Sequence, residues 1–136
     1  MSLLLVDTSV WVEYLRGTGS PAAMTLRELL RSRPDDVTLT EPVAMELLAG
    51  ARPSSLPQVE RLVEGLPSLT VEPSLDFPAA AAAYRAARSS GRTVRSLVDC
   101  LIGVVAARRG AELLHRDVDF TVLGEVLVDL RVTHLG

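Results

Sequence analysis

Four carboxylates stand alone in apolar stretches of this sequence: Asp7, Glu46, Asp99 and Asp117. Asp7 and Asp117 each follow a short, largely apolar run, as residues at the end of a buried strand do. Glu46 and Asp99 are each the lone charge near the start of an apolar segment that is long enough for a helix. Charged side chains are seldom buried unless they are paired or bind a metal, so these four acids are candidates for a shared chemical role.

Each acid also has a purely structural interpretation. Asp7 could cap the helix that follows it, and Glu46 could lie on a narrow solvent-exposed stripe of its helix. Asp99 stands three residues after Ser96, which is the spacing of a capping box, and Asp117 could be a turn residue. The two interpretations differ in one respect, because only a shared role requires the four side chains to meet.

The chemistry of such a meeting would be that of a hard metal ion. In a parallel α/β sheet, strand ends and the starts of neighbouring helices lie along the same edge, where Asp119 could add a fifth acid. Bare carboxylates repel one another, and the chain has no lysine to neutralise them. Mg²⁺ or Mn²⁺ takes oxygen ligands and can activate water for attack on a phosphodiester, so we expect a metal-dependent phosphoryl-transfer site.

The elements that must position these acids alternate along the chain between strand-like and helix-like segments. This pattern predicts an α/β fold, a three-layer α/β/α sandwich with a mainly parallel sheet of about five strands. Residues 3–6 should form the central strand, because their continuous apolar run suits a strand that is covered on both faces. The other expected strands are residues 37–39, 69–71, 112–115 and, at the edge, 130–134.

Periodic apolar residues and capping signals predict the helices. Two segments, 42–49 and 96–109, are apolar nearly all round and should be buried. Trp11 should be a core anchor. The expected helices are residues 9–16, 21–33, 42–49, 55–66, 78–90 and 96–109, with a further short helix after Phe120.

Composition narrows the alternatives. The chain has 136 residues, of which 48% are hydrophobic, so we expect a single domain over residues 1–136. All 14 basic residues are arginines, which excludes mechanisms that need lysine. The net charge of −3 argues against a simple basic nucleic-acid patch. Without the four candidate ligands, however, the remaining acids nearly balance the arginines, so a nucleic acid bridged by metal stays compatible with this charge.

Cys100 is the single cysteine, which excludes an internal disulfide framework and fits a reducing cytoplasm. With only two distant histidines, a Cys/His zinc site is also excluded. No apolar run approaches the roughly 18 residues of a membrane span, and the N-terminus lacks the basic region of a signal peptide. We therefore expect a cytoplasmic protein.

Three stretches carry a resemblance to a known family. They are LLLVDTSVWVEYLRG, EPVAMELLAG and RSLVDCLIGVVAARRGAELLHRDVDF, which together span most of the chain. The sequence resembles a PIN domain, specifically the VapC-like toxins of bacterial type II toxin–antitoxin pairs. This resemblance implies a metal-dependent endoribonuclease on an α/β/α sandwich, with Mg²⁺ or Mn²⁺ as cofactor. It also implies a homodimer and a small cognate antitoxin that covers the active site.

The family's acidic residues fall on Asp7, Glu46, Asp99 and Asp117, with Asp119 as an accessory acid. Thr8 or Ser9 would supply the hydroxyl that orients the first aspartate or a metal-bound water. The family's third acid often precedes A-L-I-A, whereas Asp99 precedes C-L-I-G, a departure that removes no ligand. On this basis Asp7, Asp99 and Asp117 would hold the metal, and Glu46 would be a ligand or would orient the attacking water.

Other roles remain open at the level of sequence. Arg16, Arg92 and Arg95 lie in loops or helix ends where they could contact RNA phosphates or simply be solvated, and His115 suits a structural role better than a catalytic one. Three rival functions compete with the toxin: a phosphoacceptor or phosphatase domain, which the missing lysine disfavours; a PIN-like binding module without catalysis; and an RNA-processing nuclease that is not a toxin.

Overall fold

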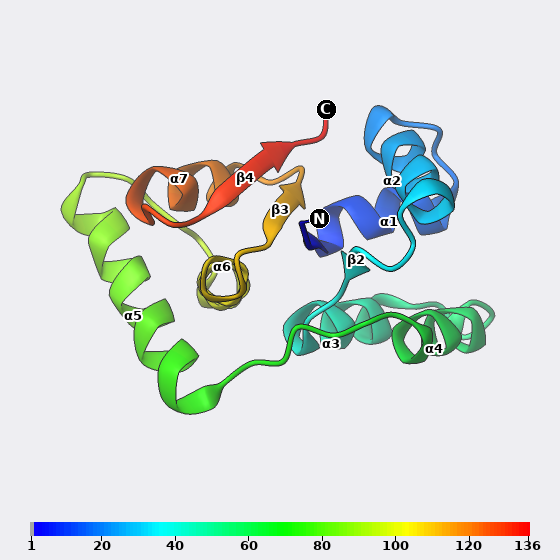
Figure 1. The fold of residues 1–136 in the computed structure, drawn as a ribbon, viewed down its shortest axis with the longest axis horizontal. Coiled ribbons are helices and arrows are strands. Elements are labelled where there is room, and N and C mark those ends of the chain that lie inside the picture. Colours follow the sequence, from blue (N-terminus) through cyan, green and yellow to red (C-terminus); the bar gives the residue numbers. More distant parts are fainter. Residues whose placement is uncertain (1) are drawn as a thin grey trace.

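A parallel four-stranded sheet organises the protein, whose computed structural model describes residues 2–136 (Figure 1). The strand order is β2-β1-β3-β4, and every neighbouring pair is parallel. Strand β1 lies between two partners, as the continuous apolar run of residues 3–6 predicts. The strands are β1 Leu4–Val6, β2 Val37–Thr38, β3 Glu112–His115 and β4 Arg131–His134.

The sheet has four strands rather than the five that the sequence suggests, because residues 69–71 form no strand. A single parallel bridge forms just before this segment, between Leu39 and Ser68. The Leu69 N–H donates to the Leu39 carbonyl at 2.7 Å, and the Leu39 N–H donates to the Pro67 carbonyl at 3.0 Å. The bridge does not extend into residues 69–71, because the chain that would pair with them leaves the extended conformation after Thr40 and becomes helical at Glu41.

Seven helices in the described part of the chain connect and cover the strands (Figure 1). Figure 1 shows α1 and α2 together on one side of the strands and α5, α6 and α7 on the other, and the helices within each group contact one another. None of those formed by residues 2–136 combines the length and the apolar character that a bilayer crossing demands. They are α1 Thr8–Arg16, α2 Pro21–Ser32, α3 Glu41–Gly50, α4 Leu56–Gly65, α5 Pro73–Ser89, α6 Leu97–Arg109 and α7 Val118–Val126.

Helix α5 begins at Pro73, five residues before the predicted start at Pro78. Proline is well suited to the first helical position, and the Asp76 carboxylate accepts the Glu72 N–H at 2.7 Å, which caps the earlier turn. Asp76 is buried and also pairs with Arg108 of α6 at 2.8 Å. This pair fastens α5 to α6 and keeps the pKa of Asp76 below its usual value, because the carboxylate accepts hydrogen bonds from Arg108.

The hydrophobic core confirms Trp11 as an anchor, since its side chain is fully buried. Helix α6 also matches its prediction, because Cys100 and residues 102–106 are buried. The prediction for α3 is wrong, because Met45 is 57% and Leu48 37% exposed. Helix α3 packs against α1, α4 and α6. These neighbours cover the face with Pro42, Val43 and Leu47, whereas Met45 and residues 48–50 face solvent.

Gly124 permits the close approach of α7 to β4. A Cβ at this position would lie 2.8 Å from Cγ2 of Val132, a branched side chain with little freedom to move away. We expect Gly124→Ala to destabilise the protein by about 1–2 kcal/mol, because overpacking outweighs the ~1 kcal/mol gain in helix propensity. Gly65→Ala in α4 is the matched control, since its Cβ would meet nothing within 4 Å. Urea unfolding of both variants measures the difference, and equal stabilities would contradict the packing argument.

Candidate active site

Asp7 and Asp117 each connect a strand to the helix that follows it. Asp7 is the N-cap of α1 and is 4% exposed. Its Oδ2 accepts hydrogen bonds from the Ser9 N–H at 2.9 Å and the Ser9 hydroxyl at 2.6 Å. Asp117 is the N-cap of α7 and accepts the Asp119 N–H at 2.9 Å. The capping interpretation of Asp7 is therefore correct, and Asp117 caps a helix where the sequence suggested a turn residue; capping fixes each carboxylate at the same edge of the sheet.

Asp99 and Glu46 approach this edge from α6 and α3. The Ser96 hydroxyl accepts the Asp99 N–H at 3.3 Å, so Ser96 caps α6. Within residues 2–136 the Asp99 carboxylate itself accepts no backbone N–H, so it does not complete a capping box. The Thr8 hydroxyl donates to Glu46 Oε1 at 2.7 Å. Glu46 thus turns toward the start of α1 and does not lie on a separate solvent stripe.

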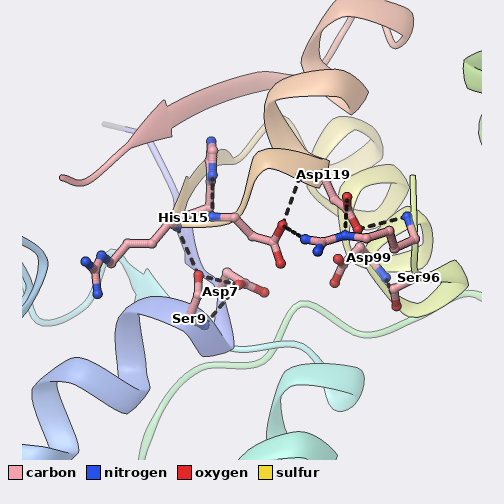
Figure 2. Close-up of polar contacts among 9 residues, drawn as sticks. Asp7, Ser9, Ser96, Asp99, His115 and Asp119 are labelled. Carbon is pink, nitrogen blue, oxygen red and sulfur yellow. Dashed lines mark hydrogen bonds and ion pairs between the residues drawn. The ribbon is translucent and has the colours of Figure 1, made fainter. Parts of the chain in front are cut away.

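The acids interact through their charges, and Figure 2 shows Asp7, Asp99 and Asp119 on the same side of the molecule at the edge of the sheet. Asp99, Asp117 and Asp119 each offer an oxygen within 4.8 Å of the others. Burial, followed by the negative charge of Asp7 and the contacts with Asp119 and Asp117, raises the pKa of Asp99 to about 8. Burial also raises the pKa of Asp7, and the charge of Glu46 acts in the same direction. The closest group of three therefore consists of Asp99, Asp117 and Asp119, and the charges of Asp7 and Glu46 act on this group from beside it.

The three arginines singled out in the sequence occupy different environments. Arg95 lies over the cluster, with Nη2 3.3 Å from Asp117 Oδ1 and Nε 3.5 Å from Asp119 Oδ1. Arg92 forms an ion pair with Glu125 instead. Arg16 lines a cleft of about 400 Å³ between α1, α3 and α4. Glu46 and Arg52 also line this cleft.

Two further residues support the cluster from behind. The Arg116 backbone N–H donates to the Ser9 hydroxyl at 3.0 Å, which links the end of β3 to the start of α1. His115 is fully buried, and its Nδ1 accepts the Asp117 N–H at 3.2 Å. Burial lowers the pKa of His115, which favours the neutral ring that this hydrogen bond needs. The Arg116 contact runs through the backbone, so no side-chain pattern in the sequence indicates it.

The comparisons agree with this arrangement. The PIN domain family matches residues 4–126. Ribonuclease VapC11 of Mycobacterium tuberculosis is 51% identical over 125 residues, which cover 91% of this chain and 93% of that relative. The chain belongs to the PIN-domain family, among the VapC proteins. Ribonuclease VapC19 of the same organism is 34% identical over 84% of this PIN domain and 88% of its own length.

Solved structures share the fold of this PIN domain. A structure of VapBC-5 from M. tuberculosis, a member of the VapBC family of toxin–antitoxin systems, aligns with a TM-score of 0.65. The identity is 24%, and the alignment covers 98% of this chain and 99% of that one. At this identity the likeness concerns the fold alone, a parallel sheet flanked by helices.

The donor set of this PIN domain suits a hard divalent cation. Asp99, Asp117 and Asp119 present carboxylate oxygens at a spacing that one ion can bridge, and Asp7 adds charge beside them. The pKa of Asp99 is raised even with Arg95 in place, so the guanidinium leaves part of the repulsion uncompensated. The buried Cys100 is no rival nucleophile, because burial raises the pKa of its thiol to about 11.

Proposed function

We propose that this protein is an endoribonuclease that hydrolyses RNA phosphodiester bonds with Mg²⁺ or Mn²⁺. The observation that carries the proposal is the meeting of Asp99, Asp117 and Asp119 within 4.8 Å, beside Asp7. The 51% identity to ribonuclease VapC11 supports RNA as the substrate. The rival without catalysis is disfavoured, because an inert module has no need of buried acids that repel one another.

Asp7, Asp99 and Asp117 would hold the cation, and the position of Asp119 in the tight group makes it a fourth candidate ligand. Glu46 would orient the attacking water, held in place by the Thr8 hydroxyl. Ser9 would keep the Asp7 carboxylate in one orientation through its two hydrogen bonds. A bound divalent ion supplies activation of water and stabilisation of charge on the phosphoryl oxygens.

The same proposal includes the biological role of a toxin. The relatives named VapC and the VapBC complexes support a cytoplasmic toxin that acts as a homodimer and is inhibited by a cognate antitoxin. The 400 Å³ cleft adjoins the acid cluster at Glu46 and carries Arg16 and Arg52 on its wall. Its position and charge suit an RNA backbone that enters the site from this side.

Metal-dependent cleavage tests the proposal. We expect purified protein to cut RNA in Mg²⁺ or Mn²⁺ and to lose all cleavage in EDTA, because without a cation the clustered carboxylates repel the phosphodiester and nothing stabilises the charge on its oxygens. Fragment analysis on a gel with a uniformly labelled RNA is the measurement, and readdition of Mn²⁺ should restore cleavage. Equal cleavage with and without EDTA would contradict a metal-dependent mechanism.

A further inference from the structure

Arg95 makes three contacts with the acids of the site. Its backbone N–H donates to Asp119 Oδ2 at 3.1 Å. Its guanidinium reaches Asp119 Oδ1 through Nε at 3.5 Å and Asp117 Oδ1 through Nη2 at 3.3 Å. Within residues 2–136 no other arginine forms an ion pair with any of the five clustered acids. Among the described residues, Arg95 is therefore the arginine whose positive charge partly neutralises the clustered carboxylates.

The contacts differ in strength along the residue. The Arg95 side chain is 69% exposed, and ion pairs at such exposure and at 3.3–3.5 Å are weak. The backbone contact is shorter and reaches a carboxylate that is only 2% exposed, so it holds the base of the residue firmly. The guanidinium can thus leave the acids while the residue stays attached to the rim of the site.

The two carboxylates that Arg95 contacts, Asp117 and Asp119, belong to the group that would hold the cation. A carboxylate oxygen that coordinates a divalent ion loses most of its capacity to accept a guanidinium hydrogen bond, and the positive charges of ion and guanidinium repel each other. Occupancy of the site by Arg95 and occupancy by a metal therefore oppose one another.

On this basis we propose that Arg95 is a built-in counter-ion that occupies the acid cluster in the metal-free protein and competes with the divalent cation for Asp117 and Asp119. This inference rests on the proposed metal-dependent function. Arg95 stabilises the empty site and weakens metal binding. When the cation binds, the released guanidinium stays at the rim, where its planar fork suits a phosphate.

Calorimetric titration with Mn²⁺, without RNA, tests the competition. We expect Arg95→Gln to bind Mn²⁺ roughly three- to tenfold more tightly than the wild type, because a weak exposed pair no longer has to break. Its melting temperature in EDTA should fall, because the acids lose their counter-ion. Arg92→Gln is the matched control: it removes the same charge from the same loop, but Arg92 pairs with Glu125, so Mn²⁺ affinity should change by less than about twofold.

Arg95→Lys guards against a folding defect in the glutamine variant. It keeps the charge but loses the fork, so its Mn²⁺ affinity should lie between those of the wild type and Arg95→Gln. Equal or weaker Mn²⁺ binding by a folded Arg95→Gln, or equal tightening by Arg92→Gln, would overturn the competition and leave the proposed nuclease untouched. Absence of Mn²⁺ binding by the wild type and both Arg95 variants at millimolar metal would overturn the metal site and the competition together.

Discussion

Replacing Asp99 by asparagine is expected to lower RNA cleavage by about 10²–10³-fold, because a metal-held phosphoryl site contributes several kcal/mol of charge stabilisation. Asparagine keeps the size of the side chain and leaves the cap by Ser96 intact, since that cap uses the Asp99 backbone N–H. The loss should therefore come from the site and not from the fold. Initial cleavage rates in Mn²⁺, at equal protein concentration, are the measurement.

The same substitution should stabilise the metal-free protein, and the effect should depend on pH. The pKa of Asp99 is raised from 3.8 to about 8 in the folded chain, so the native state keeps a proton that the unfolded state releases between these values. The free energy of unfolding of the wild type then falls as the pH rises from about 4 to about 8. Asp99→Asn lacks this fall, and near pH 8 it should be more stable by about 1–2 kcal/mol.

Asp129→Asn is the matched control for both measurements, because Asp129 is an exposed aspartate in the turn before β4. It should cleave RNA at the wild-type rate and show the wild-type dependence of stability on pH. Near pH 4 all three proteins should unfold with similar free energies. An Asp99→Asn protein that is folded, stable and still fully active would remove Asp99 from the mechanism.

The positions of Asp7 and Asp117 could be predicted from the sequence, because the topology of a parallel sheet determines them. A continuous apolar run that ends in Asp7 indicates a central strand, and the ends of parallel strands share one edge of the sheet. The segment that ends in Asp117 follows the same rule. For Glu46 the sequence left two interpretations open, and its hydrogen bond to Thr8 in another helix is a tertiary contact that no local pattern encodes.

The prominence of Asp119 and Arg95 could not be predicted. The sequence indicates Asp119 only as an accessory acid, yet it is 2% exposed and lies in the closest group of three acids. The sequence indicates Arg95 as a loop residue that either contacts RNA phosphates or is solvated. Its position could not be predicted further, because the conformation of a loop produces no periodic pattern in a sequence. The pairing of Arg95 with Asp117 and Asp119 follows from how that loop passes over the sheet edge.

The errors in the fold have local causes. Pro78 suggested a helix start, whereas Pro73 together with the cap by Asp76 begins α5 earlier. The apolar character of α3 indicated burial on all sides, but burial depends on how many neighbours a helix has. Met45 and Leu48 remain exposed because no neighbouring element covers that side of the helix.

Replacing Asp7 by asparagine is expected to abolish growth arrest in cells that express this protein without an antitoxin. Asp7 is nearly fully buried, and its negative charge at the end of β1 would attract a cation bound in the cluster. Asparagine is as good an N-cap as aspartate, and its side-chain oxygen can accept the same hydrogen bonds from Ser9. The variant should therefore fold and accumulate while lacking the charge that the chemistry needs.

Colony counts after induction measure the effect, with immunoblots to show equal protein levels. The wild type should arrest growth and Asp7→Asn should not. Ser9→Ala should be intermediate, because loss of the hydroxyl frees the carboxylate to rotate and supporting residues of this kind contribute about 10–100-fold to a metal site. Growth arrest by both wild type and Asp7→Asn would contradict catalytic toxicity. Normal growth with a wild-type protein that cleaves RNA in vitro would identify an RNA-processing nuclease instead, since the site is the same and only the cellular target differs.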